Sequence, residues 1–317
     1  MADTRKREGS ADHTRPRSLP PLRDVIARHK LSARKGLGQN FLLDLNLTRR
    51  IVRAAGSLRG MEVIEVGPGP GGLTRAILES DARRVVAIER DTRCVSALEE
   101  LAAAYPERLV IVNEDALETD LATHVSGPAK IIANLPYNIA TALLIRWIAD
   151  LDRFDGLTLM FQKEVAERLV ARPGTKPYGR LSVLVQWAAR PTSHFDVPPA
   201  AFVPPPKVMS AVIGLTPLSP PLAPANRLSL ERVTSAAFGQ RRKMLRSSLK
   251  SLDVDVGQLL ARARAAPTMR PEELDVPTFC ALARALDEFE ESSSGNRSTP
   301  GKAHPDVSSK TIRSDIA

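Results

Sequence analysis

The sequence contains few of the residues that form covalent cross-links or metal centres. Only two cysteines, Cys94 and Cys280, occur among 317 residues, and they lie far apart in the chain. The five histidines are equally scattered, whereas disulfide frameworks and zinc sites need cysteines or histidines at short, repeated spacings. The sequence therefore predicts two buried thiols in a reducing compartment and no metal site.

Long apolar runs and a secretory leader are also missing. No stretch approaches the ~18 consecutive apolar residues that a membrane span needs. The first twenty residues mix both charges with proline and contain no apolar core. With 43% hydrophobic and 26% charged residues, the composition is typical of a globular protein. We expect a cytoplasmic monomer without a membrane partner.

Positive charge is spread unevenly along the chain. The formal net charge is +9, and residues 1–40 hold ten Lys/Arg against four acids. Residues 227–270 hold ten against three, whereas residues 271–317 hold five against nine. Two separated basic segments favour a polyanion contacted at two places, because phosphate neutralisation dominates sequence-independent nucleic-acid affinity. On charge alone, a solvated basic surface without a partner explains the pattern equally well.

Short apolar runs alternate with helical patterns over the first two thirds of the chain. Near-continuous β-branched runs separated by helices are typical of a parallel sheet flanked by helices. The strands are expected at 61–66, 84–89, 108–112, 129–133, 156–161 and 208–215. The helices are expected at about 72–80, 92–104, 139–151, 162–171 and 180–189. The sequence thus predicts an α/β fold.

Composition divides the chain into five segments. Two polar segments, the basic segment 1–20 and the segment 291–317, lack apolar periodicity. Both are expected to be disordered tails. Residues 21–216 form the α/β domain, and the proline-rich segment 217–226 reads as a stiff linker. Residues 227–290 contain only helical periodicity, which predicts a small all-helical domain.

A glycine-rich turn, Glu-Val-Gly-Pro-Gly-Pro-Gly-Gly, follows the first expected strand. Its Gly67, Gly69 and Gly72 satisfy the dinucleotide spacing G-x-G-x-x-G, so the turn alone fits NAD as well as S-adenosylmethionine. Glu89 ends the second strand, where a carboxylate can accept hydrogen bonds from a ribose diol. Asp115 ends the third strand, where it can accept from an adenine amino group. The structural alternatives are an exposed strand-end acid for Glu89 and a helix N-cap for Asp115.

The sequence Asn134-Leu135-Pro136-Tyr137 follows the fourth expected strand, and it favours S-adenosylmethionine over NAD as the cofactor. The exocyclic nitrogen of adenine is a poor nucleophile, because its lone pair is delocalised into the ring. The side-chain oxygen of Asn134, with a main-chain carbonyl of Leu135 or Pro136, would accept both N–H bonds and localise that pair. Tyr137 offers a ring for base stacking, so its hydroxyl is expected to be dispensable. The alternative is a tight strand-to-helix turn with a capping Asn.

Six ordered motifs over about residues 30–285 resemble the ribosomal RNA adenine N6-dimethyltransferases. They are 34–42 (RKGLGQNFL), 65–72 (EVGPGPGG), 134–137 (NLPY), 161–165 (FQKEV), 178–183 (YGRLSV) and 202–208 (FVPPPKV). The resemblance implies a Rossmann-like class I methyltransferase sheet, S-adenosylmethionine as cofactor and no metal. It implies a substrate of two adjacent adenines near the 3′ end of 16S rRNA in the small (30S) ribosomal subunit or its precursor, with a role in ribosome biogenesis.

The same resemblance assigns functions to individual residues. It implies that Phe202 lies opposite Tyr137 across the target base. The residues that it implies for cofactor binding are Asn40, Leu42, Gly67, Glu89, Asp115 and Asn134.

A basic segment at 238–250 is the expected RNA-contacting surface. It reads as one helix with Met244, Leu245 and Leu249 turned inward. Its Arg242, Arg246 and Lys250 would then share one face and follow a phosphate backbone. The alternative is a basic helix face without a partner.

Three other functions compete with this interpretation. Large-subunit rRNA adenine methyltransferases share the Asn-aromatic motif, although they differ in the Leu-Pro-Tyr form and in the Phe-x-Pro-Pro-Pro-Lys segment. A non-catalytic ribosome-assembly or RNA-binding factor could retain the same fold as a clamp. An oxidoreductase is compatible with the glycine loop alone.

Overall fold

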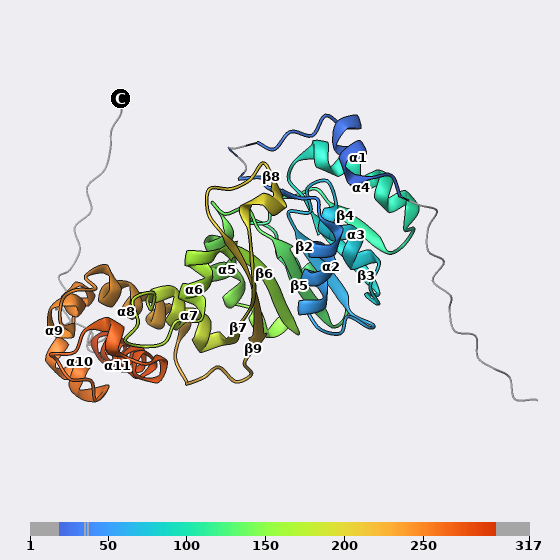
Figure 1. Cartoon of the computed structure of the whole chain (residues 1–317). Coiled ribbons are helices and arrows are strands. Elements are labelled where there is room, and N and C mark those ends of the chain that lie inside the picture. Colours follow the sequence, from blue (N-terminus) through green and yellow to red (C-terminus); the bar gives the residue numbers. More distant parts are fainter. Residues whose placement is uncertain (1–18, 35, 37, 296–317) are drawn as a thin grey trace, which may run out of the picture.

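The computed structural model describes residues 19–34, 36 and 38–295. Its centre is a seven-stranded sheet with the order β4-β3-β2-β5-β6-β9-β7 (Figure 1). Five neighbouring strands of this sheet are parallel: β2 (Glu62–Val66), β3 (Arg84–Ile88), β4 (Leu109–Val112), β5 (Ala129–Asn134) and β6 (Gly156–Gln162). Each lies within about one residue of its predicted range, because apolar β-branched runs that are buried on both faces form such strands.

Two further strands correct the prediction of a parallel sheet. β9 (Ser210–Pro217) pairs antiparallel with β6, and β7 (Ala189–Val197) pairs antiparallel with β9 at the sheet edge. β7 was not predicted, because Pro191 interrupts its sequence and the register shifts between Ser193 and Phe195. Proline and irregular register are features of edge strands, which have no partner on one side.

Helices cover both faces of the sheet. α2 (Leu45–Ala54), α3 (Gly72–Leu78) and α4 (Thr92–Ala104) share one hydrophobic cluster with the sheet. α5 (Ala140–Ile148), α6 (Lys163–Leu169) and α7 (Arg180–Ala188) share the cluster on the other face. The inner strands β2, β3, β5 and β6 are therefore buried on both sides, as a doubly wound fold requires, whereas the edge strand β4 leaves Val110 exposed.

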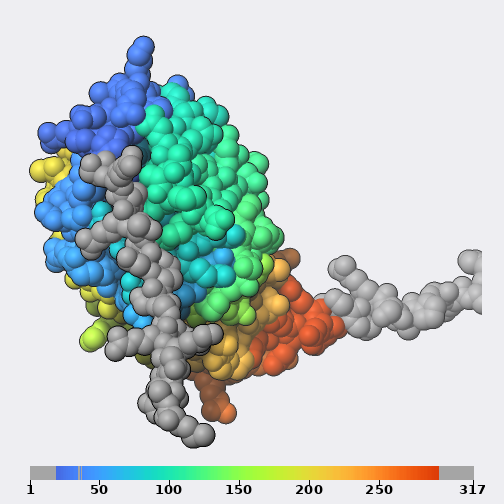
Figure 2. Space-filling model, turned by 90° about the vertical axis from the view of Figure 1, so that its right-hand side faces the viewer, coloured from blue at the N-terminus to red at the C-terminus, as the bar shows by residue number. Residues whose placement is uncertain are grey.

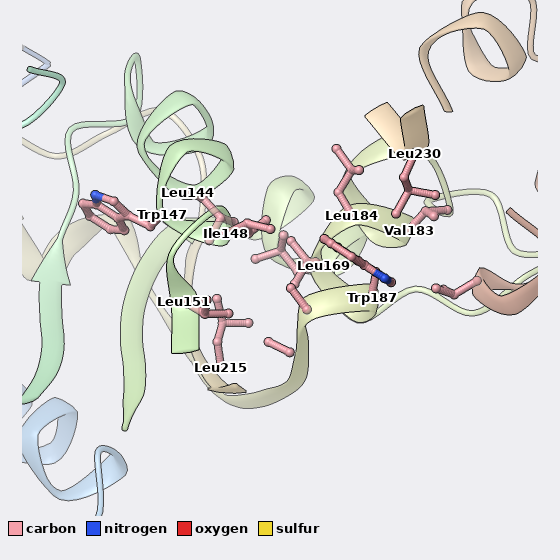
Figure 3. Close-up of a cluster of buried hydrophobic side chains, with 14 of the residues drawn as sticks. Leu144, Trp147, Ile148, Leu151, Leu169, Val183, Leu184, Trp187, Leu215 and Leu230 are labelled. Carbon is pink, nitrogen blue, oxygen red and sulfur yellow. The ribbon is translucent and has the colours of Figure 1, made fainter. Parts of the chain in front are cut away.

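The helical domain comprises α8 (Arg227–Gly239), α9 (Leu245–Ser248), α10 (Val256–Arg262) and α11 (Val276–Gly295), with 3₁₀ turns at Leu249–Leu252 and Pro271–Glu273. Its core is continuous with that of the α/β domain: Leu184 and Trp187 of α7 pack near Leu230 of α8 (Figure 3). The segment 217–226 is fastened to α7, since the Trp187 indole Nε1 donates to the Ala223 carbonyl. The two domains therefore share one core.

The described N-terminal residues pack onto the α/β domain. α1 (Leu22–Arg28) places Val25 in a small cluster with Cys94 and Ala97 of α4. In Figure 2 the dark blue N-terminal residues accordingly lie against teal residues from later in the chain. Further along, β1 (Phe41–Leu42) pairs antiparallel with β8 (Phe202–Val203). Of the tails expected at 1–20 and 291–317, residues 1–18 and 296–317 lie outside the described residues. Residues 291–295 belong to α11, which extends to Gly295, beyond the predicted boundary at 290.

Candidate active site

A cavity opens at the carboxyl ends of the parallel strands, where α/β proteins hold their ligands. It is bounded by the turns after β2, β3, β4 and β5 and by the segment that leads into β1. Nine of the residues singled out from the sequence line it together: Asn40, Leu42, Gly67, Glu89, Asp115, Asn134, Leu135, Pro136 and Tyr137. The cavity thus unites the expected cofactor residues with the expected adenine-binding residues.

The glycine turn after β2 needs its glycines for two reasons. Gly67, Gly69 and Gly71 have φ values of +69°, +56° and +89°, which side-chain-bearing residues rarely adopt. At Gly72, the first residue of α3, a Cβ atom would collide with the main-chain oxygen of Leu42. The turn therefore brings its backbone close both to the cavity and to β1.

Glu89 forms part of the cavity floor and holds the glycine turn in place. One carboxylate oxygen accepts from the backbone N–H of Gly69 at 2.9 Å, and the other accepts from that of Asp91 at 2.8 Å. Burial raises the pKa of the Glu89 carboxyl, and these two backbone donors oppose that rise. Each oxygen keeps acceptor capacity for a further donor, such as a ribose hydroxyl.

The Asp115 carboxylate is already engaged on both oxygens. One accepts from the Arg90 guanidinium at 2.8 Å, and the other accepts from the backbone N–H of Leu117 at 3.0 Å. No helix begins at Asp115, because residues 116–118 form a turn, so the second contact closes an Asx turn and is not the helix N-cap that the sequence left open as an alternative. Since a carboxylate oxygen accepts more than one hydrogen bond, this turn and contact with an adenine amino group are compatible.

Glu65 is a cavity residue that the sequence interpretation missed. Its side chain is buried at the end of β2, and one carboxyl oxygen has no hydrogen-bond partner among the described residues. Burial raises the pKa of the Glu65 carboxyl to about 8, the Thr74 side chain opposes the rise, and the nearby Glu89 charge adds to it. The signal was two acids, Glu62 and Glu65, inside an otherwise apolar strand, Met-Glu-Val-Ile-Glu-Val.

The segment before β1 lines the cavity and contacts the turn that follows β5. Gly38 lies so close to Asn138 that a Cβ atom at Gly38 would overlap the Asn138 side chain. The Gln39 amide donates to Asp91 at 3.2 Å, which ties the segment to the turn after β3. Because the Asn40 carbonyl accepts from the Asn134 side chain, this segment also orients the first residue of the Asn-Leu-Pro-Tyr motif.

The Asn134 amide has a defined direction. Its Nδ2 donates to the Asn40 main-chain oxygen at 3.1 Å, and its Oδ1 has no hydrogen-bond partner among the residues that the structure describes. The Pro136 carbonyl accepts from the N–H groups of Ile139 and Ala140, so it serves the start of α5. The Leu135 carbonyl accepts no hydrogen bond from the described residues, which favours Leu135 over Pro136 as the second acceptor.

Tyr137 lines the cavity, and its side chain reaches the first residue of β9. Its hydroxyl oxygen is 2.5 Å from Oγ of Ser210, a fully buried residue at the start of β9. Burial raises the pKa of the Tyr137 hydroxyl, and the Ser210 hydrogen bond lowers it in part. The ring therefore has a tether that the sequence did not reveal, since 73 positions separate the two residues.

Phe202 occupies a different environment. Its side chain is only 2% exposed, packs in the cluster that contains Ile51 and Val197, and is not among the cavity residues. Its β-sheet partner Leu42 does line the cavity. Stacking of Phe202 on a base would therefore require β8 to move, and its expected place opposite Tyr137 stays a prediction.

The expectation of one helix over 238–250 is wrong. α8 ends at Gly239, and α9 begins only at Leu245, because residues 240–244 form a turn. Met244 is 38% exposed instead of inward, whereas Leu245 and Leu249 are buried as expected. The three basic residues are exposed, although they do not share one helix face: Arg242, Arg246 and Lys250.

Among the described residues, no group of three or more His, Cys, Asp or Glu side chains is placed to hold a metal ion. In the same part of the chain, every helix is too short or too polar to span a bilayer.

The doubly wound sheet with its glycine turn, strand-end acids and Asn-Leu-Pro-Tyr motif defines a class I methyltransferase. The family described as ribosomal RNA adenine dimethylase matches residues 30–287. The chain belongs to that family, and it is therefore a methyltransferase enzyme. This membership removes the oxidoreductase interpretation that the glycine turn alone had left open.

Curated relatives match this chain over nearly their whole length. A ribosomal RNA small subunit methyltransferase A of Ruegeria sp. (strain TM1040) is 56% identical over 273 residues, which cover 85% of this chain and 98% of the relative. A protein of the same name from Rhodospirillum rubrum is 59% identical over 269 residues, which cover 85% and 93%.

Solved structures are similar as well. A dimethyladenosine transferase from Plasmodium falciparum has a TM-score of 0.67 at 25% identity, with 80% of this chain and 98% of that chain covered. The 23S rRNA methyltransferase ErmE has a TM-score of 0.60 at 25% identity, with 78% and 100% covered. Since the second protein is named for large-subunit RNA, the fold alone does not distinguish the two kinds of substrate.

Proposed function

We propose that the chain transfers methyl groups from S-adenosylmethionine to N6 of two adjacent adenines near the 3′ end of 16S rRNA, in the small ribosomal subunit or its precursor. The observation that carries this proposal is the direction of the Asn134 amide. Its nitrogen is held by the Asn40 carbonyl, so its oxygen is available to accept from an adenine amino group beside the Tyr137 ring. The small-subunit substrate is supported by relatives that are 56–59% identical.

The cavity residues fit S-adenosylmethionine. The glycine turn offers backbone at positions where a Cβ atom would be strained, and Glu89 has acceptor capacity for a ribose diol. Asp115 lies at the next strand end, where it can accept from the cofactor's adenine. Asn40 and Leu42 line the same cavity and would contact the cofactor through backbone or side-chain atoms. When bound, the cofactor supplies an electrophilic sulfonium methyl group.

Chemistry at the target nitrogen follows from two acceptors. Asn134 Oδ1 and the Leu135 carbonyl would each accept one N–H of the adenine amino group, which localises the nitrogen lone pair toward the methyl donor. Alignment of the two reactants then lowers the barrier. No base is needed before attack, because the surplus proton becomes acidic once the nitrogen is quaternised and leaves to water.

The helical domain would hold the ribosomal particle. Arg242, Arg246 and Lys250 are exposed and form no salt bridge with any described residue, so they are free to neutralise phosphates. This binding would couple methylation to ribosome biogenesis in the cytoplasm. We expect the enzyme to act as a monomer.

One assay tests the proposal directly. Purified protein is incubated with radiolabelled S-adenosylmethionine and unmethylated small subunits, large subunits or free 16S rRNA. We expect label in two adjacent adenines of small-subunit RNA, identified as N6,N6-dimethyladenine after nuclease digestion. Label confined to large subunits would contradict the substrate. Tight binding to small subunits without label would favour the non-catalytic assembly factor.

A further inference from the structure

Exposed apolar side chains follow one another closely at the end of β8 and in the loop that joins β8 to β9. Seven large apolar side chains are exposed in the described part of the chain; two of them lie in this loop, and a third is the last residue of β8. They are Val203, Val208 and Met209, which are 50%, 46% and 36% exposed. We call these three side chains the apolar shelf. Clustered exposed apolar surface marks a contact with a ligand more often than isolated residues do.

The shelf lies on the rim of the active-site cavity, because both ends of its loop are fastened to cavity residues. Val203 pairs with Phe41, a cavity residue of β1, and β8 lies beside that segment in Figure 1. At the other end, Ser210 is hydrogen-bonded to Tyr137. The Met209 carbonyl also accepts from the Lys163 N–H at 2.9 Å. Three consecutive prolines, residues 204–206, stiffen the loop between these ties.

We propose that the apolar shelf packs against the nucleobase next to the target adenine. This inference rests on the proposed function. A target adenine can enter the cavity only if it leaves its stack, and its covalently joined neighbours must then lie on the cavity rim. The faces of those bases are apolar, and Met, Pro and aliphatic side chains serve other proteins as wedges against unstacked bases. When the target is one of two adjacent adenines, the neighbouring base is the second adenine.

The charges beside the shelf suit a nucleic acid. Lys207 lies within the loop, is exposed and forms no salt bridge with any described residue. It is available for the phosphate between the two nucleotides. The acid Asp196, on the neighbouring strand β7, is neutralised by Lys163 at 2.5 Å. An apolar surface with a free cation and a neutralised acid matches a base with its phosphate better than it matches an acidic or purely apolar protein surface.

The test compares a shelf variant with a matched surface variant. Val208→Ser combined with Met209→Ser removes apolar surface without changing the cavity lining. Leu222→Ser, at a residue that is 52% exposed in the linker, is the control. With unmethylated small subunits, we expect the shelf variant to lose about 5- to 140-fold in kcat/KM, the range of one lost base contact of about 1–3 kcal/mol. Cofactor affinity, measured by calorimetry, and the control's kcat/KM should equal those of the parent protein.

Photocrosslinking identifies the occupant. With p-benzoylphenylalanine in place of Val208, we expect crosslinks to small-subunit RNA within two nucleotides of the methylated adenines, mapped by primer extension. Crosslinks to distant RNA or to a ribosomal protein alone would overturn the proposal, as would a shelf variant with the parent's kcat/KM. If the parent methylates small subunits in either case, the proposed function stands without the shelf. If the parent methylates no small-subunit adenine, both are overturned.

Discussion

The hydroxyl of Tyr137 lies 2.5 Å from the hydroxyl of Ser210, so a ring on the cavity wall is tied to the first residue of β9. Ser210 is fully buried and its backbone pairs with both β6 and β7. The sequence predicted a Tyr137 ring whose hydroxyl is dispensable. The hydrogen bond changes that expectation, because the hydroxyl fixes the orientation of the ring that would stack on the adenine.

Tyr137→Phe should therefore lower stability and not only activity. The change leaves the buried Ser210 hydroxyl without its partner, which costs about 1–3 kcal/mol. Ser210→Ala should have a similar effect, and the double variant should lose little more than either single one, since the two changes remove the same bond. Urea unfolding of the four proteins measures this. Fully additive losses would show that the hydrogen bond contributes nothing.

Glu89→Ala should weaken S-adenosylmethionine binding by about 1.5–3 kcal/mol, because charge-assisted bonds to the ribose are lost. Part of the loss comes from the glycine turn, since Gly69 also loses its acceptor. Isothermal titration calorimetry gives the affinity. Glu99→Ala, an exposed acid on α4, is the matched control and should bind like the parent protein. Unchanged affinity in a folded Glu89→Ala protein would remove Glu89 from the cofactor site.

The buried Glu65 carboxyl should make stability fall as pH rises. Its pKa is raised from 4.5 to about 8, so between these values the folded state holds a proton that the unfolded state releases. The contribution is complete below about pH 4.5 and is lost as pH rises through about 8. In cofactor-free protein, Glu65→Gln should flatten this fall of the unfolding free energy between pH 5 and 8, whereas the exposed Glu99→Gln should not. Equal slopes in the two variants would contradict a protonated Glu65.

The sequence predicted most of the strands because buried parallel strands are encoded locally. β2 to β6 each read as a short apolar run, and the helices between them show a helical pattern. The edge strand β7 escaped prediction because its pairing depends on β9, and the pattern around Pro191 gives no local signal. The break after Gly239 was missed because helical periodicity continues across residues 240–244, although the chain turns there.

At the site, the sequence predicted residues that end successive strands. Glu89, Asp115 and Asn134 meet because the carboxyl ends of parallel strands lie at one edge of the sheet. Contacts between distant segments could not be read in this way. The bond from Asn134 to the Asn40 carbonyl joins residues 94 positions apart, and it depends on how β1 pairs with β8. The buried position of Phe202 depends on the same pairing.

Replacing Arg242, Arg246 and Lys250 together by Ala should weaken binding to small subunits and flatten its salt dependence. Each lost phosphate contact removes about 0.7–0.9 from the slope of log K against log salt. Cofactor affinity should not change, because none of the three lines the cavity. Arg53→Ala, an exposed cation on α2, is the control. Filter binding between 50 and 200 mM salt provides the slope, because a protein with 6–10 phosphate contacts loses about 10³–10⁵-fold in affinity over this interval. An unaltered slope would contradict phosphate contacts by these three residues, and the N-terminal basic segment would become the candidate RNA-binding surface.

Asn134→Ala should reduce methyl transfer at least about 100-fold, because the Asn134 oxygen would act as the amine becomes tetrahedral, much as an oxyanion-hole donor acts in acyl transfer. Asn134→Asp is the sharper variant. It keeps an acceptor but cannot donate to the Asn40 carbonyl, so it should lose the orientation that the 3.1 Å bond gives the amide. Single-turnover rates at saturating S-adenosylmethionine separate this loss from weaker cofactor binding. Asn138→Ala, at a cavity residue outside the proposed acceptor pair, should lose far less. A wild-type rate for Asn134→Ala under these conditions would reduce the motif to a structural turn, and the adenine amino group would then need acceptors elsewhere in the cavity.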